Sequence, residues 1–100
     1  MNIYPAEIEA ALRTHRAVAD GCVFGRADRR LGETVVAAIV LRTGEKLDAA
    51  DALAYLSERL ARYKLPEHIA FVQDLPRNTS GKVVRAALIK LLEDADKAIE

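Results

Sequence analysis

Lys82 is the residue whose type and position best suit chemistry. It follows a polar stretch, Pro76-Arg77-Asn78-Thr79-Ser80-Gly81, whose residue types favour turns. Gly81 can adopt backbone angles closed to other residues, and the apolar pair Val83 and Val84 is expected to anchor the far side. Such a flexible loop can carry one long cationic side chain away from its own domain. Taken alone, the pattern is more often that of an ordinary surface lysine after a turn.

The remaining reactive side chains form no familiar catalytic arrangement. His15 and His68 are far apart in the sequence and Cys22 is the sole cysteine, so a zinc site would need unusual ligands and no metal is predicted. Cys22 lies in an apolar stretch with no evident base beside it, which predicts a core residue rather than a nucleophile. Ser80-Gly81-Lys82 is similar to the end of a P-loop, but Val83 replaces the required Ser or Thr.

Composition limits the classes of function. The 100 residues suit one domain with one modest core and leave little room for a deep substrate cavity. Fifteen basic residues balance fifteen acidic ones, so no net field is available to bind nucleic acid or an anionic membrane. No run approaches the roughly 20 apolar residues that span a bilayer. A cytoplasmic protein with neither nucleic acid nor membrane as a partner is therefore expected.

The first half of the chain predicts one helix and two strands. Pro5 suits the first position of a helix, which the apolar spacing extends to about His15. Val18 to Phe24 is predicted as a strand, and Gly25 to Gly32 as an exposed turn. Thr34 to Leu41 is apolar at every position after its first, which indicates a strand covered on both faces and central in the sheet.

The second half predicts two helices on either side of a short strand, Ile69 to Val72. Asp48 suits a helix cap, and the first helix is expected to run to about Tyr63, before Pro66. The side chains expected to face the core are Leu53, Leu56 and Leu60 in that helix and Leu88, Leu91, Leu92 and Ala95 in the last. The order of elements predicts an α+β fold: a small, mostly antiparallel sheet of about three core strands, with three helices packed on it.

Several short segments follow one another in a specific order along nearly the whole chain. They are Asn2-Ile3-Tyr4-Pro5-Ala6-Glu7-Ile8-Glu9, Val23-Phe24-Gly25-Arg26-Ala27-Asp28, Gly32-Glu33, Tyr63-Lys64-Leu65-Pro66, Phe71-Val72, Leu75-Pro76 and Asn78-Thr79-Ser80-Gly81-Lys82-Val83-Val84-Arg85. In this order and spacing they resemble the C-terminal domain of the adenylate-forming superfamily, which includes acyl-CoA synthetases, luciferases and the adenylation domains of peptide synthetases.

The resemblance implies a role for Lys82, because the family places its catalytic lysine in the last of these segments. In the family, a large N-terminal domain binds ATP, magnesium and the carboxylic acid, and the small domain swings between two poses. In the first pose Lys82 would bridge the attacking carboxylate and the α-phosphate, on a loop formed by Thr79, Ser80 and Gly81. A cation placed there stabilises the negative charge that accumulates on oxygen.

The second pose makes the thioester, and the resemblance implies that it brings Asn2, Ile3 and Tyr4 to the channel for the pantetheine arm. The run from Asn2 to Pro5 is closer to acyl-CoA synthetases than to peptide synthetase domains, which favours coenzyme A (CoA) as the acceptor. Cations that could meet the phosphates of the CoA nucleotide are Arg26, Arg29, Arg30 and Lys64. The alternative for each is an ordinary solvated charge.

Residues 1–100 are thus expected to be the C-terminal lid domain of an AMP-forming acyl-CoA ligase, without its ATP- and acyl-binding domain. The family motif normally begins with glycines just before Asn2, so Met1 is interpreted as an artificial or alternative start. The chain alone is expected to be inactive and to bind no cofactor. Two alternatives stay open: a stand-alone interaction or regulatory module with this fold, and part of a carrier-protein-loading adenylation domain.

Overall fold

β2 (Gly32–Leu41) is the middle strand of a three-stranded sheet with the order β1-β2-β3. The computed structural model describes residues 3–30 and 32–99, with side chains up to residue 94. β1 (Val18–Asp28) pairs with β2 in the antiparallel direction, and β3 (His68–Phe71) pairs with β2 in parallel. Within the described residues, three α-helices complete the fold: α1 (Pro5–Arg13), α2 (Ala49–Ser57) and α3 (Arg85–Ile99). The predicted α+β class is confirmed, with a mixed sheet.

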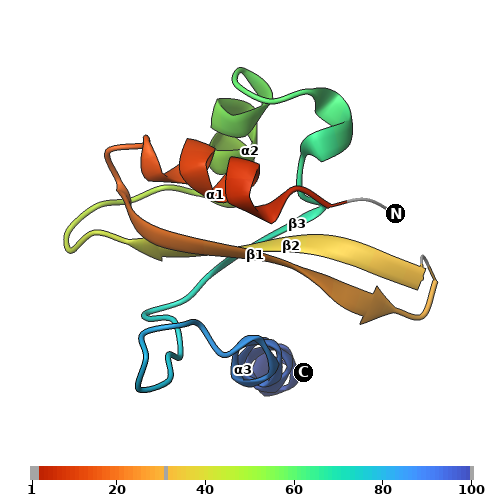
Figure 1. Cartoon of the computed structure of the whole chain (residues 1–100). Coiled ribbons are helices and arrows are strands. Elements are labelled where there is room, and N and C mark those ends of the chain that lie inside the picture. Colours follow the sequence, from red (N-terminus) through yellow and green to blue (C-terminus); the bar gives the residue numbers. More distant parts are fainter. Residues whose placement is uncertain (1–2, 31, 100) are drawn as a thin grey trace.

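α1 and α2 cover one face of the sheet and α3 covers the other (Figure 1). Successive β2 residues therefore meet different helices. Val35 and Ile39 belong to the apolar cluster of α1 and α2, whereas Val36 and Ala38 pack in a second cluster with Leu88 of α3. A strand covered on both faces needs apolar side chains at every position. The central place expected for residues 34–41 is confirmed.

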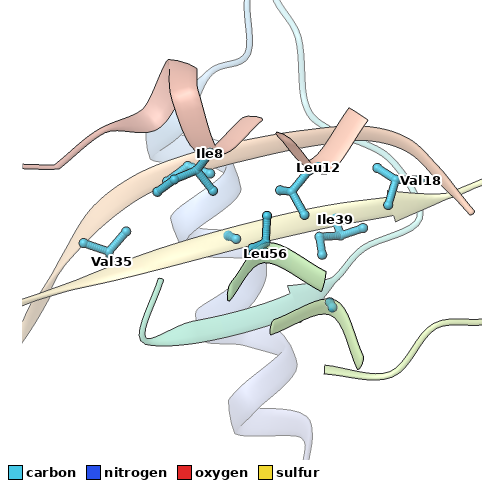
Figure 2. Close-up of a cluster of buried hydrophobic side chains, with 9 residues drawn as sticks. Ile8, Leu12, Val18, Val35, Ile39 and Leu56 are labelled. Carbon is cyan, nitrogen blue, oxygen red and sulfur yellow. The ribbon is translucent and has the colours of Figure 1, made fainter. Parts of the chain in front are cut away.

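α1 begins at the predicted Pro5, which lies in its first turn. Ile8 and Leu12, four residues apart and so on one face of the helix, are buried against the sheet (Figure 2). Gly21 of β1 permits this close packing, because a Cβ at that position would lie 3.2 Å from Leu12 Cδ1. The helix ends at Arg13 rather than at His15.

The β1–β2 hairpin is longer than predicted. The pairing runs from Val18 opposite Leu41 to Asp28 opposite Gly32, so residues 25–28, expected in an exposed turn, belong to β1. The prediction of a turn there was wrong because it was based on the polar Arg and Asp side chains. Strands pair through backbone hydrogen bonds, which polar residues form as well. The β1–β2 pairing therefore continues beyond the apolar core. The Asp28 carboxylate accepts a hydrogen bond from Arg30 N (2.8 Å) where the chain leaves the strand.

α2 is shorter than predicted. Asp48 caps it as expected, accepting a hydrogen bond from Asp51 N (2.7 Å), but the helix ends at Ser57. The chain then turns extended at Ala61 and forms a separate 3₁₀ turn at Arg62–Lys64. Of the three leucines expected to be buried, Leu56 is fully buried and Leu60 packs partly on the core, whereas Leu53 is 37% exposed. The buried stripe is Ala52 and Leu56, four residues apart, which turns Leu53 outward.

α3 also buries a narrower stripe than predicted. Leu88 and Leu92 are buried four residues apart, whereas Leu91 is 45% exposed. The prediction for Leu91 was therefore wrong: a single helix resting on one face of a thin sheet covers fewer positions than a helix in a bundle. The prediction for Ala95 lies outside the residues whose side chains are described.

Candidate functional site

The segment before α3 forms a closed turn rather than the flexible loop expected from its composition. Val84 N donates a hydrogen bond to Pro76 O (2.8 Å), and Asn78 N donates one to Lys82 O (2.9 Å). Arg77 and Val83 form an isolated antiparallel bridge between these two bonds. Backbone hydrogen bonds therefore join the two sides of the loop below its tip.

The Asn78 side chain holds the tip of the loop. Its Oδ1 accepts hydrogen bonds from Ser80 N (3.0 Å), Ser80 Oγ (2.7 Å) and Lys82 N (3.1 Å). Gly81 N donates to Asn78 O (3.0 Å), and Gly81 has a φ of 87°, a left-handed conformation that favours glycine. Thr79, predicted with Ser80 and Gly81 to support the lysine, is exposed. The backbone on both sides of Lys82 is thus fixed by Asn78.

Lys82 itself projects from this fixed backbone into solvent. Its side chain is exposed. No carboxylate within the described part of the chain lies within ion-pairing distance of its ammonium group. The neighbouring Arg13 and Arg77 are paired with carboxylates, whereas Lys82 has no such partner among the described residues.

A shallow pocket of about 360 Å³ opens beside Lys82, between the loop, α1 and the first residues of β1. Its charged lining residues are Glu9, Arg13, Asp20, Arg77, Lys82 and Arg85. Four cations against two carboxylates leave an excess of positive charge. Asp20 pairs with Arg77 Nη2 and with Arg13 Nε (3.7 Å), and Glu9 Oε1 lies 4.0 Å from Arg13 Nη2. The pocket can therefore receive a negatively charged group next to the lysine.

Of the residues predicted for the pantetheine channel, Ile3 and Tyr4 lie directly before α1. Asn2 is outside the described residues, and Ile3 packs against the core cluster of α1 and α2. The ring of Tyr4 meets the ring of Tyr63 edge to face, with centroids 5.8 Å apart. Tyr63 is 71% exposed. These two rings form an aromatic surface that was not predicted from the sequence, although Tyr63 belongs to the family-like segment Tyr63-Lys64-Leu65-Pro66.

The four cations predicted to meet CoA phosphates do not form one site. Arg26 lines a pocket of about 270 Å³ with His68 and Leu92, on the α3 face of the sheet. Lys64 lies on the opposite face, where its Nζ contacts both carboxylate oxygens of Glu7 (3.0 and 3.1 Å). That hydrogen bond raises the pKa of Lys64.

Arg29 and Arg30 are exposed beyond the end of β1. Neither belongs to the pocket beside Lys82, nor to the one beside Arg26. They are the two exposed members of the predicted set.

A family model described as the AMP-binding enzyme C-terminal domain matches residues 7–82 of this chain. The match spans most of the chain, from α1 to the exposed lysine of the closed loop. The chain belongs to the family of AMP-binding enzyme C-terminal domains. The resemblance seen in the sequence is confirmed.

Relatives of this AMP-binding C-terminal domain include acid–CoA ligases. It is 50% identical over 82 residues to an indoleacetate–CoA ligase of Aromatoleum aromaticum, covering 82% of this chain and 16% of that enzyme. ATP-bound MatB from Rhodopseudomonas palustris superposes with a TM-score of 0.84 and 37% identity, over 95% of this chain and 19% of MatB. The o-succinylbenzoate CoA synthetase MenE of Bacillus subtilis, in complex with the acyl-adenylate intermediate OSB-AMP, gives 0.77 and 41%, over 88% and 18%. The chain therefore spans less than a fifth of these relatives.

The other reactive side chains of this domain serve structure. Cys22 is buried at 4% exposure, and burial, followed by the nearby charge of Glu9, raises the pKa of its thiol. His15 Nδ1 accepts a hydrogen bond from Ala17 N (3.0 Å) and its ring packs on Tyr55. The described residues hold no group of three or more His, Cys, Asp and Glu side chains suited to a metal ion. None of the described helices has the length and apolar character of a membrane span.

Sequence reasoning missed the residues that hold the lysine's support. Asp20 and Arg77 are 57 positions apart, and nothing local to either predicts their ion pair. Asn78 was assigned to the turn and to the last family segment, but no role was predicted for its side chain. An Asn two residues before a Ser and four before the lysine can accept hydrogen bonds from the turn that follows it. That signal was present in the sequence.

Proposed function

We propose that this chain is the lid domain of an ATP-dependent, AMP-forming carboxylic acid–CoA ligase and that Lys82 is its adenylation lysine. The observation that carries the proposal is the position of Lys82: an exposed ammonium group, without an ion pair to any described residue, on a backbone fixed by hydrogen bonds. A lysine that only keeps the surface solvated has no need of an ordered backbone. A lysine that acts on a substrate in a second domain needs one, because its ammonium group must reach a defined position.

The chemistry proposed for Lys82 is electrostatic. When a carboxylate attacks the α-phosphate of ATP, two negatively charged groups meet and charge builds on the phosphoryl oxygens. An ammonium group held between them stabilises that charge and keeps the reactants in line. The positive excess of the pocket beside Lys82 acts in the same sense.

The positions of the two site segments support a change of pose. The loop between β3 and α3 is on the α3 side of the sheet, whereas the chain enters α1 on the other side (Figure 1). Segments on opposite sides of the sheet are suited to facing one active site in turn. We propose that Lys82 faces it during adenylation and that the segment of Asn2, Ile3 and Tyr4 faces it during thioester formation.

Arg29 and Arg30 are proposed as the first contacts for the phosphates of the CoA nucleotide, because both are exposed and close in sequence. Lys64 is already paired with Glu7, and Arg26 lies on the α3 face of the sheet. All four cations could contact CoA only if they bound different phosphate groups. ATP and magnesium are assigned to the large N-terminal adenylating domain, the proposed partner. Alone, the chain is expected to be inactive.

The test joins this chain to its large domain and compares wild type with Lys82→Ala. Adenylate formation, measured by pyrophosphate release, should fall by at least about 10²-fold, the scale on which one electrostatic donor contributes to catalysis. Conversion of a supplied acyl-adenylate to the CoA thioester should stay within about twofold of wild type. An equal loss in both half-reactions, or in neither, would reject the role of Lys82.

A matched control is Lys90→Ala, which removes another exposed lysine from α3, eight residues further along the chain. It should leave both half-reactions unchanged.

Replacing CoA by a carrier protein bearing a phosphopantetheine arm tests the acceptor. Faster transfer to the carrier protein would place the domain in a carrier-loading enzyme instead.

A further inference from the structure

Asp20 lies at the start of β1, where the pairing of β1 with β2 shifts register between Val18 and Asp20. Its Oδ1 accepts a hydrogen bond from Gly21 N (2.8 Å), which fixes the orientation of the carboxylate. The side chain is 29% exposed, so solvent screens its charge only in part. Asp20 is therefore a fixed negative group on the rigid sheet, at the rim of the pocket beside Lys82.

The guanidinium of Arg77 joins Asp20 to the lysine loop. Arg77 Nη2 pairs with Asp20 Oδ2, and Arg77 Nη1 donates a hydrogen bond to Gly81 O (2.9 Å). Gly81 O belongs to the peptide bond that leads directly into Lys82. A planar guanidinium can hold a carboxylate and a carbonyl at a set distance, which a flexible ammonium cannot do as well. The loop tip is thereby tied to β1.

Asp20 also reaches α1 through Arg13 Nε (3.7 Å). The sheet, the first helix and the loop thus meet at one carboxylate. Asn78 fixes the loop internally, and Leu75 and Val83 pack the base of the loop on the α3 face of the sheet. The contact of Arg77 with Asp20 ties the tip itself to β1. Without it, the loop could keep its turn and still tilt.

We propose that Asp20 is a positioning residue for adenylation, which acts on Lys82 through Arg77. The proposal rests on the proposed function of Lys82. When the domain docks on its partner, the sheet and helices fix its orientation. The contacts from Asp20 through Arg77 to Gly81 then fix the position of Lys82 relative to the sheet. A displacement of about 1 Å in a catalytic group is enough to cost on the order of 10²-fold in rate.

The experiment uses the complete ligase and measures both half-reactions in Asp20→Asn and Arg77→Lys. Each variant should lower the single-turnover rate of adenylate formation by about tenfold or more. The KM for ATP and for the acid should change little, because neither residue is proposed to touch substrate. Thioester formation from supplied acyl-adenylate should be unchanged, which shows at the same time that the variants fold. Loss of both half-reactions to the same degree would overturn the proposal.

The matched control is Glu58→Gln, which breaks the exposed pair of Glu58 and Arg59 (3.5 Å) at the end of α2, away from the loop. It should have no effect on adenylation. An effect equal to that of Asp20→Asn would mean that any lost surface charge suffices, and would reject the proposal.

A double-mutant cycle separates this proposal from the one on which it rests. In a Lys82→Ala background, Asp20→Asn should cause no further loss, since a positioning residue has nothing left to position. Full additivity of the two losses would overturn the role of Asp20 while leaving Lys82 in place. No effect of Lys82→Ala by itself would overturn the proposed function instead.

Discussion

Arg77 Nη1 donates a hydrogen bond across 2.9 Å to the carbonyl of Gly81, the residue directly before Lys82. The same guanidinium pairs with Asp20, which belongs to β1. A side chain from one arm of the loop thus fixes the other arm and the sheet together. The exposed Lys82 side chain extends from a backbone held by hydrogen bonds, as its proposed entry into a second domain requires.

Gly81→Ala should separate backbone strain from catalysis. Gly81 has a φ of 87° and no atom within 4 Å of the added Cβ, so the change strains the backbone without a clash. We expect a loss of about 1–2 kcal/mol in the free energy of unfolding, measured in urea, and slower adenylation by the complete ligase. Gly44→Ala is the control: Gly44 has a φ of 82° and an equally open surrounding. It should lose similar stability but retain adenylation; equal slowing would argue against a special role for the loop.

Asn78→Ala should open the tip of the loop. It removes the acceptor of three hydrogen bonds, including the one from Lys82 N. Amide hydrogen exchange at Ser80 and Lys82 should accelerate by about five- to tenfold, because one such bond contributes about 1 kcal/mol. Asn78→Asp keeps an acceptor oxygen and should retain most of the protection. Unchanged exchange in Asn78→Ala would show that the backbone bonds alone hold the turn.

Leu88→Ala and Leu91→Ala test which face of α3 packs on the sheet. Leu88 is fully buried and Leu91 is 45% exposed. Truncation of Leu88 should cost about 2–5 kcal/mol in the free energy of unfolding because it leaves a cavity. Truncation of Leu91 should cost less than about 1 kcal/mol. Equal losses in denaturant melts would contradict the orientation of α3.

Cys22 should be protected in the folded protein and should make stability depend on pH. Burial raises the pKa of its thiol above the ordinary value of 9.0, so the folded state holds the proton more tightly than the unfolded state. Its contribution to stability is therefore complete below pH 9.0 and is lost as pH rises through the folded pKa. Urea unfolding between pH 8 and 11 should show a steeper fall for wild type than for Cys22→Ala.

Alkylation gives an independent check on the same thiol. At pH 8.5, iodoacetamide should modify Cys22 at least about tenfold more slowly in the native protein than in urea, since the thiolate is the reactive form and is disfavoured by burial. Comparable rates would place the thiol at the surface.

The amino-acid sequence by itself determined the central strand, the starts of the first two helices and the family. An unbroken apolar run can be stable only between two covering layers, and Pro5 and Asp48 act within a few residues of their own position. Lys82 was singled out because its turn is a local pattern and its segment resembles that of the family; its role stays a prediction. Such features depend on residues that are close in the chain, so they can be predicted from the sequence.

The tertiary structure alone decided what lies between distant positions. Only folding brings Asp20 to Arg77, places Arg26 and Lys64 on opposite faces of the sheet, and turns Leu91 to solvent while Leu88 is buried. The physical reason is that side chains alternate along a strand and rotate along a helix, so a small change in where an element ends or packs moves a residue to another face. Lys82 could be singled out from the sequence, whereas the contacts that join its loop to the sheet exist only where β1 lies beside the loop.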